Sequence, residues 1–238
     1  MKEPQRLSEW FVPSFGPLRF RVAVGLLFLP YTGMVLSFVV IGSMLAETIH
    51  WDRVAAIVVI YFLALGIGAH ALDALGSQAI KPWGAVFSKR QLWAVAAGSV
   101  MLAYAIGLYY IVRYAPLLGV IAVMEGFFLL AYNLEWFRGR FHTNAWFAFS
   151  WGFLPVLAGY VIQTNSISPA IVLVAAAMAA LSLVEINASR PYKALKRSTD
   201  GHTVEGRAQA AQFEVILKSV SLGVILLGTA LLTWRWNL

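Results

Sequence analysis

The feature that most constrains this chain is a series of seven apolar runs, each about 20 residues long, separated by short polar stretches. A helix of that length crosses a hydrocarbon core of about 30 Å, whereas a membrane barrel would show alternating segments of about ten residues. We therefore predict an all-α integral membrane protein, a bundle of about seven transmembrane helices. The runs fall at about 22–46, 54–76, 92–112, 116–134, 145–163, 169–188 and 213–234.

Composition excludes a soluble globule, because 60% of the 238 residues are hydrophobic and only 12% are charged. The absence of cysteine excludes disulfides and thiolate chemistry. Residues 1–19 place Trp10, Phe11 and Phe15 among charges and prolines, and they lack the apolar core and cleavage site of a signal peptide. We expect them to form an interfacial segment, with a disordered tail as the alternative, and residues 20–238 to form a single transmembrane domain.

Basic residues are divided unevenly between the two sides of the predicted bundle. If the loops alternate between sides, one side holds only Arg53, Arg113 and Arg235, and the other holds nearly all the remaining Lys and Arg. Positively charged loops stay in the cytoplasm, so we predict a cytoplasmic N-terminus and a C-terminus on the opposite side of the plasma (inner) membrane. This distribution accounts for the net charge of +7 without a nucleic-acid partner.

Prolines and small residues mark places where helices bend or meet. Pro30 and Pro155 lie inside predicted spans and should kink them. Small residues such as Ala64, Gly68 and Gly159 permit close packing between helices.

Polar side chains inside the runs are the best indication of a site, since an ionisable group at the bilayer centre costs about 2.5 to 3.5 kcal/mol on insertion scales. His70 and Asp73 are three residues apart near the end of the second run, so they share a helix face. Glu125 lies near mid-depth in the fourth run. Tyr132 shares its face about 10 Å nearer the cytoplasm, and Asn133 follows at the boundary.

The sixth and seventh runs bring further polar groups to the cytoplasmic edge. The sixth ends with Glu185 and Asn187, and the seventh begins with Glu214 and Lys218 at the spacing of an intrahelical ion pair. Acidic groups from four helices thus reach one side of the bilayer, next to basic segments. That layout suits a divalent cation with an anionic head group, since magnesium bridges carboxylates and phosphates. The adjoining basic residues are Lys81, Arg138, Arg190 and Lys193.

These polar groups also have ordinary structural explanations. His70 is equally well explained as a packed core histidine, and Glu214 with Lys218 as a plain ion pair. Glu125 is harder to explain in this way, because a carboxyl group about ten residues from either boundary cannot easily reach water. We expect it to face the bundle interior in its neutral form.

Parts of the chain resemble the UbiA superfamily of intramembrane prenyltransferases, over about residues 19–200. The similar segments are the end of the second run with the following Lys-Pro-Trp-Gly-Ala-Val-Phe-Ser (81–88), the Tyr132 region, and Trp-Gly-Phe-Leu-Pro-Val-Leu-Ala-Gly-Tyr (151–160). The resemblance implies a helical bundle with a cytoplasm-facing cavity that opens sideways to lipid. It also implies a prenyl diphosphate substrate, bound through magnesium between two aspartate-rich motifs.

Only part of the family's catalytic pattern is present in this chain. Asp73 is the one aspartate of the first motif, where His70 takes another position, and Glu185 is the one carboxylate of the second. The resemblance therefore implies Asp73 and Glu185 as ligands of a single Mg²⁺. It implies substrate or diphosphate contacts at Lys81, Tyr132, Asn133, Arg138, Asn187, Arg190 and Lys193.

The sequence leaves two functions open. The first is an intramembrane enzyme acting on an isoprenoid or prenyl-diphosphate substrate by prenyl transfer or cyclisation. In one form Asp73, His70 and Glu185 promote loss of the diphosphate; in another, protonated Glu125 protonates a double bond. The second function is a non-catalytic lipid- or isoprenoid-binding protein, or a partner subunit, derived from the same fold.

Aromatic residues and the lysine of the last run bear on these alternatives. The aromatic side chains either shelter a carbocation or serve packing. A retinal protein is disfavoured, because Lys218 lies only about one turn into the last run and the N-terminus is predicted inside. The aromatic residues concerned are Phe127, Phe128, Phe149, Phe153 and Tyr160.

Overall fold

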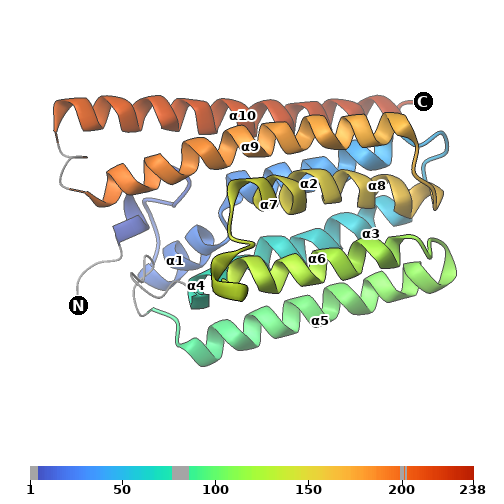
Figure 1. Ribbon diagram of the computed structural model, residues 1–238, viewed down its shortest axis with the longest axis horizontal. Helices are drawn as coiled ribbons and strands as arrows, with labels where there is room; N and C mark the ends of the chain where they lie inside the picture. The colour runs from blue at the N-terminus through green and yellow to red at the C-terminus, as the bar shows by residue number, and fades with distance from the viewer. Residues whose placement is uncertain (1–4, 77–85, 199–200, 202) are drawn as a thin grey trace.

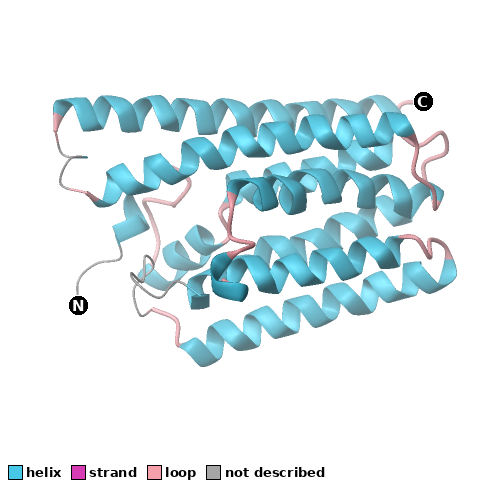
Figure 2. Cartoon of the chain, in the orientation of Figure 1, coloured by secondary structure: helices cyan, strands magenta, loops and turns pink. Residues whose placement is uncertain are grey.

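The computed structural model of the chain describes residues 5–76, 86–198, 201 and 203–238. Regular structure in this part of the chain is entirely helical, and short loops join the helices (Figure 2). The prediction of an all-α protein is therefore confirmed. In chain order the elements are η1 (Gln5–Ser8), α1 (Leu18–Leu26), α2 (Leu29–Met44), α3 (Trp51–Tyr61), η2 (Phe62–Ala69), α4 (His70–Gly76), α5 (Lys89–Arg113), α6 (Leu118–Asn133), η3 (Phe137–Gly139), α7 (Asn144–Ala148), η4 (Phe149–Phe153), α8 (Leu154–Thr164), α9 (Pro169–Arg197) and α10 (Val204–Trp236).

The helices run lengthwise beside one another, with α10 and α9 along one edge, α6 and α5 along the other, and α2 and α8 between them (Figure 1). Consecutive elements join end to end into longer helical rods that run along the bundle. Helix α1 continues into α2, α3 continues into α4 through the π-helical turn η2, and α7 continues into α8 through the π-helical turn η4.

Six rods in the described part are long and apolar enough to cross a membrane, which supports an integral membrane protein. The seventh predicted span, at 116–134, is the 16-residue helix α6. At 1.5 Å per residue it is about 24 Å long, short of a core of about 30 Å. Helix α6 still packs within the bundle, against α5 and α8. The six rods are Leu18–Met44, Trp51–Gly76, Lys89–Arg113, Asn144–Thr164, Pro169–Arg197 and Val204–Trp236.

Both prolines predicted to kink spans lie at helix irregularities. The first rod breaks at Leu27 and Phe28, and Pro30 takes the second position of α2, where a missing N–H is harmless. Phe28 has a φ of 43°, a left-handed conformation that is rare for a bulky residue. Pro155 is the second residue of α8, just after the π-helical turn η4, where the α-helical hydrogen-bond pattern is already interrupted.

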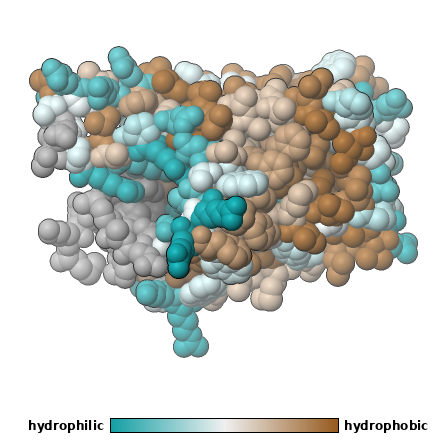
Figure 3. Space-filling view, viewed as in Figure 1, coloured by the Kyte–Doolittle hydropathy of each residue, from teal (hydrophilic) through white to brown (hydrophobic). Residues whose placement is uncertain are grey.

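Charged residues gather at the two ends of the bundle. One end, which we call the basic end, holds the start of α1, the end of α4, the start of α5, the α6–α7 connection, the end of α9 and the start of α10. In Figure 3, hydrophilic residues gather toward the left and again along the right edge, and hydrophobic surface lies between them. The opposite end carries Arg53, Arg113 and Arg235. Described basic residues at the basic end are Arg19, Arg21, Lys89, Arg90, Arg138, Arg140, Arg190, Lys193, Lys196, Arg197 and Arg207.

The N-terminal segment folds back against the basic end. Arg21 Nε donates to the Pro13 carbonyl at 2.7 Å. The ring of Phe11 lies on that of Phe28, with 5.3 Å between centroids. The hydroxyl of Tyr192 lies 2.9 Å from Glu9 Oε2. The segment is thus held by α1, the start of α2, and α9.

Helix α2 lies in the centre of the bundle, and 12 of its 16 residues are buried. It meets α8 through two glycines: a Cβ on Gly42 would overlap the Val156 carbonyl, and one on Gly159 would overlap the Val39 carbonyl. Ser43 Oγ also donates to the Gly159 carbonyl at 3.0 Å. The two backbones meet without side chains between them, as the small residue Gly159 predicted.

We predict that Gly42→Ala and Gly159→Ala each lower thermal stability, because the added methyl group would overlap a backbone carbonyl of the facing helix. Overpacking of this kind costs about 1–3 kcal/mol. Thermal unfolding of the purified protein in detergent measures the effect. Gly98→Ala is the matched control, since a Cβ there meets nothing within 4 Å. Equal unfolding temperatures for Gly42→Ala and the control would contradict this account of the α2–α8 contact.

Candidate functional site

His70 is surrounded by aromatic rings near the basic end. It begins α4, directly after the π-helical turn η2. Its ring stacks on Phe28, with 5.0 Å between centroids, and lies 5.4 Å from the ring of Trp151. Thr32 Oγ1 is a polar neighbour, 3.5 Å from His70 Nε2. We call Phe28, Thr32, His70 and Trp151 the His70 cluster.

Irregular backbone from three rods converges on the His70 cluster. The π-helical turn η2 ends one residue before His70, and the π-helical turn η4 contains Trp151. Such turns are frequent at functional sites. The left-handed conformation of Phe28 is a further departure, of a kind that costs on the order of 1–3 kcal/mol and persists only where the surroundings hold it.

Helix α9 approaches the cluster through Lys193. Lys193 Nζ lies over the rings of Phe28 and Tyr31, at 5.1 and 5.3 Å from their centroids. The Tyr31 hydroxyl donates to Ser189 Oγ at 2.6 Å. Glu185, about two turns before Lys193, is 2% exposed and feels the charge of that lysine. Its Oε1 has no hydrogen-bond partner among the described residues.

A second polar group at the basic end centres on Tyr132. Its ring stacks on His142 with 4.4 Å between centroids, and His142 Nδ1 lies 3.0 Å from the Tyr132 carbonyl oxygen. Arg190 Nη2 donates to the His142 carbonyl at 3.2 Å. The Tyr132 hydroxyl is within electrostatic reach of both Arg190 and Asp73. Asp73 of α4 and Arg190 of α9 are thus brought to one tyrosine.

The remaining predicted contacts have other roles or lie outside the described residues. Asn133 Nδ2 donates to a carbonyl one turn earlier in α6, at 2.8 Å. Asn187 accepts a hydrogen bond from Asn144, which joins α9 to α7. Arg138 is exposed in η3, with a left-handed backbone. Lys81 lies outside the described residues.

The magnesium site implied by Asp73 and Glu185 stays a prediction. Among the described residues, no group of three or more His, Asp or Glu side chains could hold a metal ion. The two implied ligands have different neighbours: Asp73 lies near Tyr132 and Arg190, whereas Glu185 is buried near Lys193. Magnesium is usually held by carboxylates together with substrate oxygens, and here a lysine already supplies charge to Glu185.

Glu214 and Lys218 form the intrahelical ion pair expected from their spacing. Lys218 Nζ lies 2.7 Å from Glu214 Oε1, and the lysine side chain is 48% exposed. The same Nζ lies 5.2 Å from the ring centroid of Trp10 in the N-terminal segment. Lys218 therefore serves the attachment of that segment and does not face the bundle interior as a retinal-binding lysine would.

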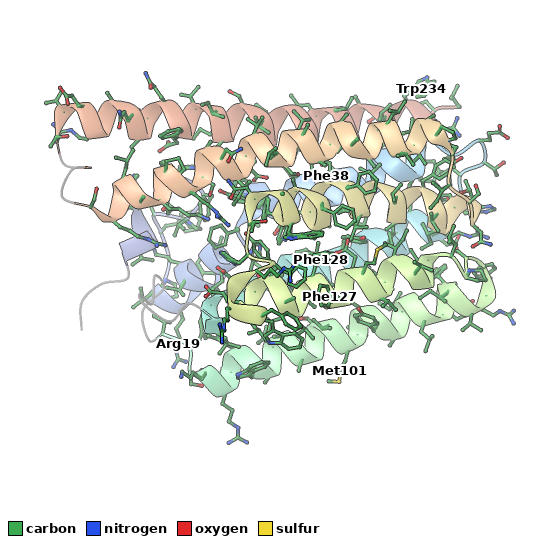
Figure 4. The ribbon with its side chains drawn as sticks, viewed as in Figure 1. Arg19, Phe38, Met101, Phe127, Phe128 and Trp234 are labelled. Carbon is green, nitrogen blue, oxygen red and sulfur yellow. The ribbon has the colours of Figure 1, made fainter. Side chains whose placement is uncertain are left out.

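The phenylalanines considered as carbocation shelters pack on one another. The ring of Phe128 contacts those of Trp146 and Phe149, with centroid distances of 5.1 and 5.6 Å. Phe149 also stacks on Phe153. Figure 4 shows Phe127 and Phe128 together near the basic end of α6. None of these phenylalanines is among the described residues that line the cavity of the bundle, so they serve packing.

An apolar cavity of about 540 Å³ lies between α3 and η2 on one side and α5 and α6 on the other, and it reaches Ala158 of α8. Its inner wall is buried, as at Ile121, which is 3% exposed. At its rim, Met101 and Val123 are 66% and 73% exposed, and Met101 points away from the bundle in Figure 4. In a bilayer these rim residues face lipid, so the cavity opens sideways between α5 and α6.

The cavity contains one acidic side chain, Glu125. The Tyr61 hydroxyl donates to Glu125 Oε1 at 2.8 Å and so links α3 to α6. Nearby, the Tyr104 hydroxyl donates to the Ala122 carbonyl at 2.7 Å. Gly126 makes room for this contact, because a Cβ there would overlap the Tyr104 hydroxyl. Glu125 faces the interior, as the sequence indicated.

The cavity and the polar groups of the basic end lie at different levels of the bundle. Along α6, Glu125 is seven residues, about 10 Å, from Tyr132. Along the second rod, Tyr61 is nine residues, about 13 Å, from His70. A long amphiphile could therefore occupy the cavity with its chain and reach the basic end with an anionic head.

Two residues of these groups, His142 and Tyr61, were not predicted from the sequence. His142 lies in the connection between α6 and α7, outside the apolar runs in which polar groups stood out. Tyr61 is one of nine tyrosines in an aromatic-rich chain, and its partner is on another helix. Only the expectation that Glu125 needs a buried partner could have pointed to it.

Searches of the chain against protein-family models, curated proteins and solved structures found no match. The resemblance to the UbiA superfamily therefore stays a prediction, and the site has to be interpreted from its own geometry.

We predict that His70→Phe keeps thermal stability within about 1 kcal/mol of the original protein, because phenylalanine preserves the ring contacts with Phe28 and Trp151. His70→Ala should lower stability by about 2–4 kcal/mol, since it leaves a cavity between those rings. Thermal unfolding in detergent measures both. If His70→Phe unfolds as early as His70→Ala, the hydrogen bonds of the imidazole outweigh its packing.

Proposed function

We propose that the protein is an intramembrane enzyme of UbiA-like architecture that acts on an isoprenoid-like lipid held in the cavity between α5 and α6. The observation that carries this proposal is the cavity, an apolar space of about 540 Å³ that opens sideways and has one carboxyl group in its wall. Its volume lies within the range of about 300–1,000 Å³ that is typical of small-molecule sites. A plain hydrocarbon chain fits its lining.

The polar groups of the basic end support an amphiphilic substrate. Lys193 and Arg190 place positive charge where α9 leaves the bundle, about 10 Å or more from Glu125 along the helices. A phosphate or diphosphate head group is attracted by such charges. We assign Asp73 and His70 to the same region, as residues that orient the head group.

A second candidate function is non-catalytic binding of the same class of lipid. It is favoured by the surroundings of His70, whose ring is packed between Phe28 and Trp151. Binding needs only the cavity, whereas diphosphate chemistry also needs charge compensation at the basic end.

We further propose that the basic end faces the cytoplasm of a plasma (inner) membrane, with the N-terminus inside and the C-terminus outside. The division of described Arg and Lys between the two ends supports this orientation. At the opposite end, Arg53 and Arg235 are occupied by backbone carbonyls of the α8 end and of the residues after α2.

The absence of cysteine permits a direct test of orientation. We predict that Ser166→Cys, exposed at the opposite end, reacts with a membrane-impermeant maleimide in intact cells, whereas Ser8→Cys, exposed at the basic end, reacts only after lysis. Gel-shift labelling of the two variants gives the readout. The reverse pattern would contradict the proposed topology.

Two glycines of α5 provide a matched test of the cavity. A Cβ on Gly107 meets only Ile60 Cδ1, at 3.9 Å, so Gly107→Leu has room for its Cβ and places a larger side chain in the cavity wall. Gly98 has nothing within 4 Å of an added Cβ and is not among the residues that line the cavity. We predict that Gly107→Leu loses at least about tenfold of the lipid that copurifies with the original protein, because a leucine occupies the volume of the chain, and that Gly98→Leu keeps it. Mass spectrometry of extracted lipids measures this loss.

The fate of the bound lipid separates the two candidate functions. Purified protein is incubated with prenyl diphosphates and a range of acceptors, and the products are analysed by mass spectrometry. Product formed by Gly98→Leu but not by Gly107→Leu supports the enzyme. Lipid that stays chemically unchanged in both supports the binding protein. Equal lipid content in the two variants would refute the cavity as the site.

A further inference from the structure

The cavity wall holds a carboxyl group with one uncommitted oxygen. Tyr61 donates to Glu125 Oε1 at 2.8 Å, and the hydroxyl of Tyr104, which also lines the cavity, is committed to the Ala122 carbonyl. Glu125 Oε2 makes no hydrogen bond to a described residue, and Glu125 borders the cavity. Among the polar atoms of Tyr61, Tyr104 and Glu125, Glu125 Oε2 is therefore the one left for a ligand in the cavity.

We expect Glu125 to be neutral, because it lines an apolar cavity. Among the described residues, Glu214 and Lys218 form an ion pair, and Glu125 has no cationic partner of this kind. A carboxyl group in apolar surroundings without such a partner avoids the cost of burying a charge by remaining neutral. Because Oε1 accepts from Tyr61, we expect the acidic proton to reside on Oε2.

A neutral carboxyl group in this position suits hydrogen bonding better than proton transfer. Protonation of an isolated double bond requires a strong acid, whereas a carboxyl group kept neutral by its surroundings is a weak one. Hydrogen bonding to an oxygen requires only a donor at the correct place, and an unpaired oxygen inside an apolar cavity gains more from a donor than it does in water.

We propose that Glu125 donates a hydrogen bond to a hydroxyl or carbonyl oxygen of the isoprenoid-like ligand, that Tyr61 positions the carboxyl group, and that the ligand enters from the bilayer between α5 and α6. This inference rests on the proposed function, because the chain of the ligand must occupy the cavity. It adds that the ligand is oxygenated and that its oxygen lies at the level of Glu125.

A hydrophobic carbodiimide tests whether Glu125 is a neutral acid open to the bilayer. The carboxyl oxygen of Glu125 bonds to the central carbon of dicyclohexylcarbodiimide, the acid proton moves to a carbodiimide nitrogen, and the adduct rearranges to a stable acylurea with no leaving group. We expect peptide mass spectrometry of the full-length protein in lipid nanodiscs to find one carbodiimide added at Glu125. Absence of this adduct would overturn the inference.

Matched carboxyl groups and variants define the specificity of labelling. Glu185 is 2% exposed, near Lys193 and outside the cavity, so it should stay unlabelled. A water-soluble carbodiimide with an amine nucleophile should modify exposed Glu135 but not Glu125. Gly107→Leu, which retains Glu125 and fills the cavity, should reduce labelling at least about tenfold, and Gly98→Leu should not. Labelling of Glu125 by the water-soluble reagent would overturn entry from the bilayer.

Protection from labelling tests recognition of the oxygen. The competitors are geranylgeraniol and the hydrocarbon of the same chain that lacks the hydroxyl group. We expect geranylgeraniol to protect Glu125 at a concentration about three- to tenfold lower, the difference that one hydrogen bond provides. Tyr61→Phe should reduce this preference while labelling continues, because the carboxyl group is then free to turn.

The outcomes separate the inference from the proposed function. Equal protection by the alcohol and the hydrocarbon would overturn recognition of an oxygen and leave the cavity as a lipid site. No protection by either, with Glu125 still labelled, would overturn the proposed lipid site and with it the inference. A preference for the alcohol that is unchanged in Tyr61→Phe would overturn the positioning role of Tyr61.

Discussion

The structure depends on one constraint: inside a hydrocarbon layer every backbone N–H and C=O needs a partner within the protein. Regular helices meet it along most of the chain, and serines and threonines also bond to carbonyls of their own helices, as Ser37 does to Gly33 and Ser221 to Leu217. The π-helical turns η2 and η4 depart from this regularity. They come near each other where the ring of His70, the residue after η2, lies 5.4 Å from that of Trp151 in η4. Within the bundle, neighbouring helices can satisfy the altered pattern.

The same constraint separates two kinds of chemistry along the bundle axis. At the basic end, polar side chains from α4, α6 and α9 can meet one another and water, and charge is concentrated there. At the level of the cavity, a single carboxyl group is balanced by a tyrosine hydroxyl. Under the proposed function, a charged ligand group would be stabilised at the basic end, and a neutral polar group at the level of Glu125 would meet its carboxyl group. A lipid that uses both levels needs its oxygen and its head group about 10 Å or more apart.

Much of this arrangement follows from the sequence, because membrane helices are encoded by length and hydropathy. The apolar runs, the breaks at Pro30 and Pro155, the close contact at Gly159 and the inward position of Glu125 were all predictable. The length of α6 was not, since the apolar residues after Pro116 begin in a turn and the helix itself starts at Leu118. Side-chain partnerships between helices, such as Tyr61 with Glu125, depend on rotation and register, which hydropathy does not specify.

The cavity also shows that small residues in these helices do not always mark a close contact between helices. Gly68 does lie tight against α5, but Ala64, one turn earlier on the same rod, borders open space, as does Gly107 on the facing helix. A small residue thus permits either a close contact between helices or an open space between them, depending on the side chains that the partner helix places opposite it. Protein interiors are close-packed, so a space of about 540 Å³ lined in part by alanines and glycines would ordinarily be closed by larger side chains. Its opening toward lipid resolves this difficulty, because a bilayer supplies hydrocarbon chains that can fill it. Under the proposed function, the packing defect and the ligand site are one feature, and a larger side chain in the cavity should remove both.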